Sequence, residues 1–121
     1  MEADAVLSIL SRCKDGEWTL VSSNVVKREV SKQTDTRRLE KVEALLSIAS
    51  EMLKATTTTV EKAEAFQKGG IKVFDSYHLA IADENGCDVF LTTDDRLLKR
   101  AAGQALNIRT ANPATWILEV I

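Results

Sequence analysis

The sequence predicts an α/β domain with a small, mostly parallel sheet. Short apolar runs that suit strands alternate along the chain with longer segments whose apolar residues recur at helical spacing. The length of 121 residues suits one domain spanning residues 1–121. Hydrophobic residues make up 45% of the chain and charged residues 28%, which is typical of a globular protein rather than a disordered one. A single core between helices and a sheet is therefore expected.

The first half of the chain predicts three helices and one strand. Residues 3–14 place their apolar side chains on one face, as an amphipathic helix does. A short strand is predicted over residues 18–21, and Ser22-Ser23-Asn24 supplies a cap for the helix that follows it. Asp35-Thr36 is the next cap signal, and helical spacing continues from there to about residue 54. This last segment is expected to form the longest helix.

Two further helices are predicted in the middle of the chain. Four threonines at residues 56–59 interrupt the helical spacing, and one of them is expected to cap a helix over residues 60–68. Gly69-Gly70 ends that helix as a C-terminal cap would. Asp75 then stands just before an apolar run whose spacing suits a buried helix, so its carboxylate is expected near free backbone N–H groups.

The last third predicts two strands and two short helical segments. Residues 88–93, DVFLTT, form a short apolar run that fits a buried parallel strand. A helix follows and ends near Gly103, and residues 107–110 suit a small strand. Asn112-Pro113 is a turn with proline at the first helical position, before a closing helix or tail. Only three strands are visible in total, which is few for a doubly wound sheet.

Composition argues against several classes of protein. No apolar run is long enough to span a membrane, and the N-terminus lacks the basic region of a signal peptide, so a cytoplasmic location is expected. The two cysteines show no metal-type spacing. The net charge of −2 does not indicate a nucleic-acid binder, although a site made of carboxylates can itself make a chain acidic.

Acidic residues gather where the predicted elements begin and end. Asp94 and Asp95 follow the predicted strand over residues 88–93, and ligands of open α/β sheets bind at the carboxyl ends of strands. Carboxylate oxygens suit Mg²⁺ or Mn²⁺, which would also neutralise acids brought together with Asp75. The alternative for the Thr-Thr-Asp-Asp turn is simply a strand end followed by a helix cap.

Two other polar residues have two interpretations each. His78 lies three residues after Asp75, hence on the same face of the predicted helix. It is either a partly buried histidine near the acids or a base or metal ligand. Glu29 is either a site residue or a solvated helix residue paired with a neighbouring lysine or arginine.

Four motifs occur in one order along nearly the whole chain. A Ser-Ser pair precedes a glutamate in residues 22–29, and Asp-Ser-x-His-Leu-Ala-x-Ala follows at residues 75–82. Phe-Leu-Thr-x-Asp-Asp stands at residues 90–95 and Asn-Pro at residues 112–113. In this order the motifs resemble the PIN domain, a compact nuclease fold that includes the toxin ribonucleases of bacterial toxin–antitoxin pairs. The resemblance implies a PIN-like three-layer α/β/α fold.

The resemblance also implies a set of site residues. Glu29, Asp75 and Asp94 correspond to acidic residues of the site, and Asp95 to a fourth member or an outer partner. Thr92 resembles the family's small supporting hydroxyl residue, and His78 lies within the second motif. The implied activity is hydrolysis of single-stranded or structured RNA by water activated by Mg²⁺ or Mn²⁺.

The sequence departs from the family pattern at its start. PIN domains begin with a central strand that ends in an aspartate, and that strand would precede residues 3–14. Asp4 is a poor substitute because it lies inside a predicted helix with no strand before it. We therefore expect either a natural start upstream of Met1 or a domain that has lost one ligand and a strand. A lost strand would leave strand edges unpaired, which favours a homodimer or larger assembly.

Three functions are consistent with these observations. The first is a metal-dependent ribonuclease of PIN type, which as a toxin would have an antitoxin protein as partner. The second is a catalytically impaired PIN-like module that binds RNA or a protein without cutting, and the third is an unrelated α/β ligand-binding domain. A basic cluster that includes Lys27 and Arg28 flanks Glu29 and would hold an RNA backbone, although a solvated face with ion pairs explains it equally well.

Overall fold

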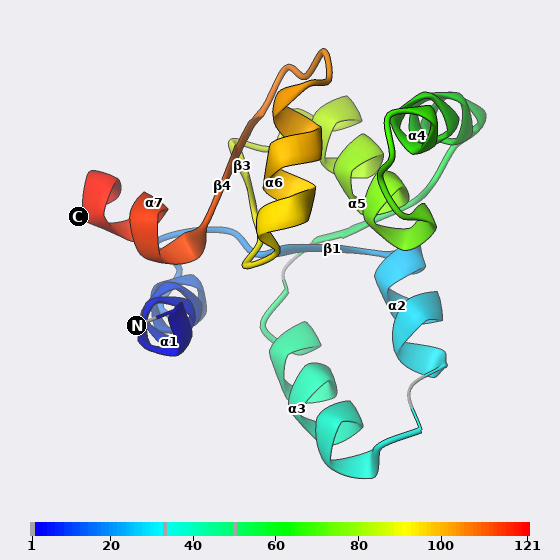
Figure 1. Cartoon of the computed structure of the whole chain (residues 1–121). Coiled ribbons are helices and arrows are strands. Elements are labelled where there is room, and N and C mark those ends of the chain that lie inside the picture. Colours follow the sequence, from blue (N-terminus) through cyan, green and yellow to red (C-terminus); the bar gives the residue numbers. More distant parts are fainter. Residues whose placement is uncertain (1, 33, 50) are drawn as a thin grey trace.

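The computed structural model shows an α/β fold of seven helices and four short strands within residues 2–32, 34–49 and 51–121, which are the residues it describes (Figure 1). Eight of these residues have no described side chain, namely Glu2, Ala3, Lys27, Arg38, Lys41, Val42, Leu45 and Leu46. The elements are, in order, α1 (Glu2–Lys14), β1 (Val21–Ser23), α2 (Asn24–Ser31), α3 (Thr36–Leu46), β2 (Glu51–Leu53), α4 (Thr57–Lys68), α5 (Val73–Glu84), β3 (Val89–Leu91), α6 (Asp95–Ala102), β4 (Arg109–Ala111) and α7 (Pro113–Val120).

The described strands pair in two parallel sheets of two strands each. In one, β1 lies beside β2 with Val21 opposite Glu51. In the other, β3 lies beside β4 with Val89 opposite Arg109. The predicted α/β class with small parallel sheets is therefore confirmed.

The prediction of one long helix over residues 36–54 was wrong. The helix α3 ends at Leu46, and Glu51–Leu53 forms β2 instead. Apolar spacing in this segment is compatible with a helix, but β1 offers its backbone groups as partners, and pairing with them satisfies the backbone of residues 51–53. A fourth strand thus appears where sequence periodicity indicated a helix end.

Smaller differences concern where elements begin. The first strand is Val21–Ser23 rather than residues 18–21, so Ser22 is a buried strand residue and not part of a cap. Ser23 ends this strand and also caps α2, because its side chain accepts a hydrogen bond from the N–H of Val26 at 3.2 Å. The threonine cap of the fourth helix is confirmed: Thr56 caps α4, three residues earlier than predicted.

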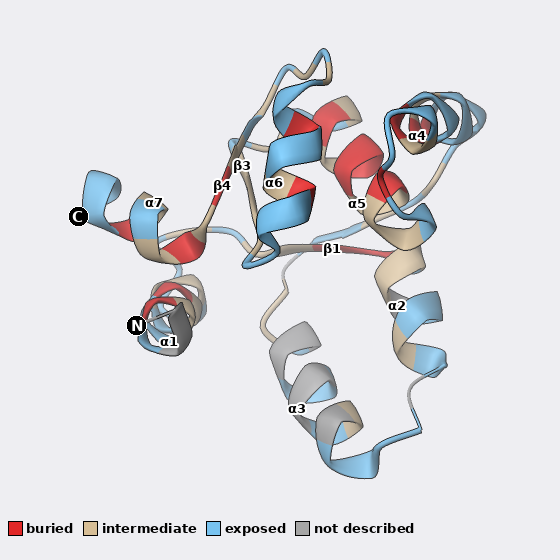
Figure 2. Ribbon diagram, in the orientation of Figure 1, coloured by how far each residue is buried: buried red, intermediate tan, exposed pale blue. Residues whose placement is uncertain are grey.

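The main core lies around α5, between α4 and α6 (Figures 1 and 2). Leu79 and Ala80 of α5 are fully buried at its centre. The cluster consists of Ala63, Phe66, Ile71, Leu79, Ala80, Leu97 and Ala101. Because α5 lies at the centre of this core, side chains on its first turns are placed on a packed element.

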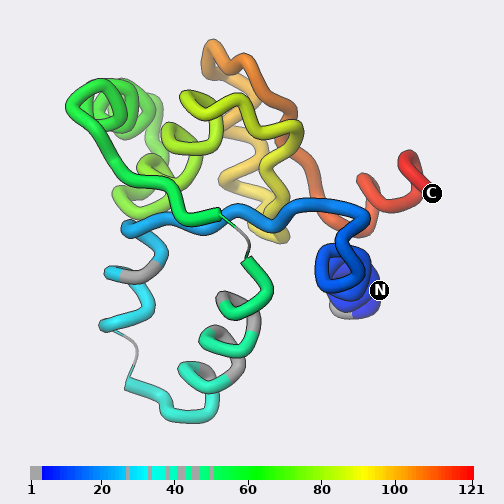
Figure 3. The backbone as a smooth tube through the Cα atoms, turned by 180° about the vertical axis from the view of Figure 1, so that it is seen from behind, coloured from blue at the N-terminus to red at the C-terminus, as the bar shows by residue number. Residues whose placement is uncertain are grey.

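A second, smaller core joins the two ends of the chain. Helices α1 and α7 pack together through Ala5, Ile9 and Ile117. Trp18 and Trp116 meet edge to face beside this cluster, with ring centroids 4.8 Å apart. Figure 3 shows the two termini on the same side of the molecule.

One buried carboxylate is structural. Asp83 accepts a hydrogen bond from Lys62 Nζ at 2.8 Å and another from the N–H of Asn107 at 2.6 Å. These contacts tie α4 and α5 to the segment before β4, and they satisfy both oxygens of Asp83.

In the described ranges, no helix combines the length and the apolar character that a bilayer crossing requires.

Candidate active site

Asp94 lies in the turn that joins β3 to α6. Its Oδ1 atom accepts hydrogen bonds from the N–H groups of Arg96 at 3.0 Å and Leu97 at 3.1 Å, so it caps α6. The hydroxyl of Thr92 in turn accepts a hydrogen bond from the N–H of Asp94 at 3.1 Å. The structure records no bond to Oδ2 of Asp94 from the residues it describes, so this oxygen is available to a ligand.

Asp75 is the third residue of α5. The helix begins at Val73, so Asp75 lies in its first turn, near the N-terminus as predicted. Carboxylates are favoured there by the helix dipole. The start of the helix is fixed by Ser76, whose N–H bonds the carbonyl of Lys72 at 2.8 Å and whose hydroxyl bonds that of Val73 at 2.6 Å.

The electrostatic surroundings of Asp75 link it to the other acids. Burial raises the pKa of its carboxyl above the ordinary value of 3.8. His78 and Lys72 act in the opposite direction, whereas the negative charges of Asp94 and Glu29 raise this pKa further. Ionised Asp75 is thus disfavoured by its site, and a bound cation would relieve that cost.

Glu29 and His78 are brought together from two helices that are distant in sequence. Nε2 of His78 on α5 lies 2.9 Å from Oε1 of Glu29 on α2. His78 is mostly buried, its ring is stacked on Phe74 at a centroid distance of 6.4 Å, and its Nδ1 has no partner in the described part of the chain. Glu29 therefore pairs with a residue one turn after Asp75. The alternative, pairing with a neighbouring lysine or arginine, is not seen among the side chains that the structure describes, which do not include Lys27.

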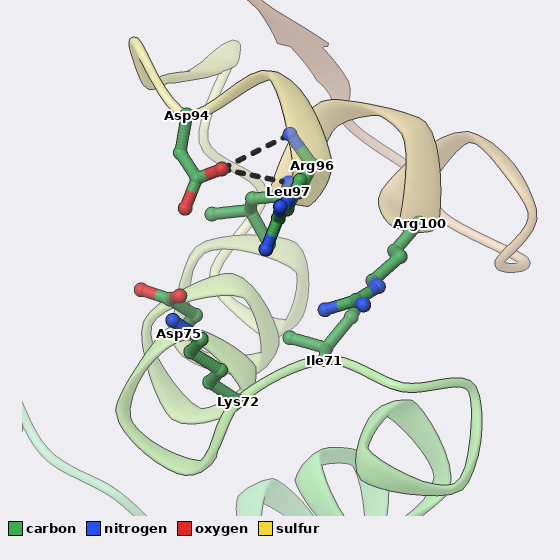
Figure 4. A pocket seen from close by; sticks show the side chains of 7 residues that line it. All are labelled: Ile71, Lys72, Asp75, Asp94, Arg96, Leu97 and Arg100. Carbon is green, nitrogen blue, oxygen red and sulfur yellow. Dashed lines mark hydrogen bonds between the residues drawn. The ribbon is translucent and has the colours of Figure 1, made fainter.

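Asp75 and Asp94 share a small pocket between α5 and α6 (Figure 4). Its volume is about 20 Å³, which is room for roughly one water molecule or ion. Three cationic side chains also line it, which the sequence analysis missed. A signal for them exists, since each cation is close in sequence to one of the acids. The lining residues are Ile71, Lys72, Asp75, Asp94, Arg96, Leu97 and Arg100.

Other candidates lie outside this pocket. Asp95 is the exposed first residue of α6 and does not line it. Arg28 is exposed on α2 and does not line it either, while the side chain of Lys27 falls outside the described residues. Asp4 lies on α1, the helix that packs against α7.

The donor set can be compared with what a divalent cation needs. Among the described residues, no group of three or more histidine, cysteine, aspartate or glutamate side chains is arranged to hold a metal ion. However, Mg²⁺ is commonly bound by one or two carboxylates, with water and substrate phosphate completing its shell. Asp75 and Asp94 on one small pocket supply that number of carboxylates.

Comparison with models of known families identifies the family of the chain. The family model of the PIN domain matches residues 5–104, which include Glu29, Asp75 and Asp94. The chain belongs to the PIN domain family. The fold is accordingly of nuclease type, and PIN domains generally depend on divalent metals. A comparison with curated proteins found no match.

Proposed function

We propose that this PIN domain is a metal-dependent endoribonuclease that hydrolyses RNA phosphodiester bonds. The observation that carries the proposal is the pocket shared by Asp75 and Asp94, two carboxylates that come from different elements and have no ion-pair partner among the described residues. In this proposal both hold Mg²⁺ or Mn²⁺. Such a cation, when bound, lowers the pKa of a water and stabilises negative charge on the phosphate.

The remaining residues act on the acids. Glu29 adds a third carboxylate near Asp75, and the contact with His78 fixes the orientation of the Glu29 side chain. Thr92 holds the turn that carries Asp94, so it is a supporting residue rather than one that touches RNA. We place Asp95 in an outer role because it lies beside Asp94 but outside the pocket.

The experiment is an RNA cleavage assay with Mn²⁺, with Mg²⁺ and with EDTA, on the chain and on Asp75→Asn. We expect cleavage that requires the metal and that falls by at least about 100-fold in the variant, because even outer residues of metal sites commonly contribute 10–100-fold. Glu64→Gln, an exposed residue of α4, is the matched control and should cut like the parent. Cleavage that persists in EDTA or in Asp75→Asn would contradict the proposal.

The toxin role is a finer proposal that rests on the motif resemblance. It implies a cytoplasmic ribonuclease with an antitoxin protein as partner. Expression of the chain should then arrest growth of the host cells, and Asp75→Asn should relieve the arrest. Equal growth with both chains would remove the toxin role without touching the nuclease proposal.

A catalytically impaired module that binds RNA or a protein remains the second candidate. It is favoured by one observation, namely that no three-acid metal group occurs among the described residues. The cleavage assay separates the two. RNA binding in EDTA without any cleavage in Mn²⁺ would select the binding module.

We also propose that the chain associates with a second copy of itself. Within the described residues β1 pairs only with β2 and β3 only with β4, and residues of β1 and β3 line one groove of about 730 Å³. The hydroxyl of Ser22 is buried in this region and has no hydrogen-bond partner among the described residues. Unpaired strand edges are sites where another chain can add backbone hydrogen bonds.

Sedimentation velocity over a range of protein concentrations tests this association. We expect a dimer or larger species that dissociates on dilution, because backbone pairing at the groove is intermolecular. Replacing Ser22 by proline should weaken the association, because proline has no backbone N–H group to donate and is disfavoured in a paired strand. A monomer at every concentration would exclude self-association.

A further inference from the structure

The pocket of Asp75 and Asp94 is lined by more positive than negative charge. Lys72 precedes α5, and Arg96 and Arg100 come from α6. Three cations against two carboxylates leave the lining with a charge of 3 − 2 = +1, apart from any bound metal. Figure 4 shows Lys72 beside Asp75 and the two guanidinium groups extending from α6 toward the start of α5.

None of these three cations is engaged in an ion pair within the described part of the chain. Other basic residues are, since Lys62 pairs with Asp83 at 2.8 Å and Arg12 with Glu17 at 3.2 Å. The cationic side chains of the pocket therefore keep their N–H groups for a ligand, although carboxylates lie close by. Arginine presents five such donors in a planar arrangement that matches phosphate oxygens.

The arrangement on α6 suits a chain of phosphates. Arg96 and Arg100 are four residues apart on one helix, so their side chains are neighbours on the same face. The side chain of Arg100 passes close to Gly70, where a Cβ, if present, would lie 3.4 Å from the Nε atom of Arg100. The first N–H groups of α6 are not available to an anion, because Asp94 already caps Arg96 and Leu97. Anion binding at this place therefore depends on the side chains of Arg96 and Arg100.

The size of the pocket limits what the cationic side chains around it could bind. A volume of about 20 Å³ has no room for a nucleotide. A polymeric substrate must therefore lie across the pocket mouth, with the exposed Arg96 and Arg100 in contact with its backbone.

We infer that Arg96 and Arg100, together with Lys72, bind the phosphate backbone of a single RNA strand across the mouth of the Asp75/Asp94 pocket. This inference rests on the proposed function for its ligand. The three residues are positioning residues that hold phosphates on one flank of the acids. They differ from Arg28 of the basic cluster on α2, which is not among the described residues that line the pocket.

The test is the salt dependence of RNA binding, measured in EDTA by fluorescence anisotropy with a labelled single-stranded RNA oligonucleotide. The variant is Arg96→Gln with Arg100→Gln. The matched control is Lys68→Gln with Lys99→Gln, which removes the same charge from exposed positions outside the pocket. We expect the slope of log affinity against log salt to fall in magnitude by about 1.4 in the variant, at about 0.7 per phosphate contact, and affinity to fall by about tenfold or more.

A third variant, Arg96→Lys with Arg100→Lys, keeps the charge and should retain most of the salt slope. A slope in the glutamine variant equal to that of the control would overturn the inference, as would an absence of RNA binding by the parent chain. These outcomes are distinct from failure of the nuclease proposal. Metal-dependent cleavage with an unchanged slope rejects the arginines alone, whereas an altered slope without any cleavage rejects the nuclease alone.

Discussion

Replacement of Asp75 and Asp94 together by asparagine is expected to abolish Mn²⁺ binding, measured by isothermal titration calorimetry. Both carboxylates line the same small pocket, which has room for about one ion. Asparagine keeps the shape of each side chain but removes the charge that hard divalent cations require. We therefore expect saturable heats with the parent chain and only heats of dilution with the double variant.

The double variant is designed to stay folded. The amide oxygen of asparagine at position 94 can accept the same hydrogen bonds from Arg96 and Leu97, so the cap of α6 is kept. Burial and neighbouring acids raise the pKa of Asp75 in the fold above its unfolded value. The native state therefore binds the proton more tightly, and the stability this contributes is present at low pH and lost as the pH rises through the raised pKa. At neutral pH the ionised side chain costs stability, so the metal-free variant should melt no lower than the parent.

The control variant carries Glu61→Gln and Glu64→Gln on α4, two exposed carboxylates away from the pocket. It should bind Mn²⁺ as the parent does.

Proton competition gives a second readout, because the raised pKa of Asp75 moves its titration upward. As the pH is lowered, affinity for Mn²⁺ should therefore begin to fall at a higher pH than it would for a site built on an ordinary aspartate. Undiminished binding by the double variant would place the metal elsewhere.

Leu79→Ala is expected to have the largest effect on stability. Leu79 is fully buried on α5, in the core between α4 and α6, where truncation leaves a cavity. Such substitutions cost about 2–5 kcal/mol, a large share of the roughly 5–15 kcal/mol that stabilises a domain. Because α5 also carries Asp75 and His78, metal binding should weaken with the fold. Urea unfolding followed by circular dichroism measures the loss.

The matched control is Leu118→Ala on α7, where the side chain is 76% exposed. It removes the same atoms from a site already in water, so its cost should stay within about 0.5 kcal/mol. Equal costs for the two leucines would mean that α5 is not the centre of the core.

Features that depend on neighbours in sequence could be predicted. The helix that carries Asp75, the strand before Asp94 and the cap of α7 by Asn112-Pro113 follow from residues within one or two turns. The order of the motifs likewise indicated the PIN family, which the family model confirms. These features are local because capping and periodicity involve residues a few positions apart.

Features that depend on contacts between distant segments could not be predicted from the sequence. Residues 51–53 form a strand only because β1 lies beside them, and their own periodicity allows a helix. The contact of His78 with Glu29 joins residues 49 positions apart, and the pocket joins the starts of α5 and α6.

The sequence by itself determined the helices around the site, the acids at their ends and the family. Only the tertiary structure decided which acids meet, that β1–β2 and β3–β4 form separate sheets, and that Lys72, Arg96 and Arg100 surround Asp75 and Asp94. The physical reason is that local conformation is set by backbone and side-chain preferences within a few residues. Strand pairing and charge clusters instead depend on how the whole chain packs.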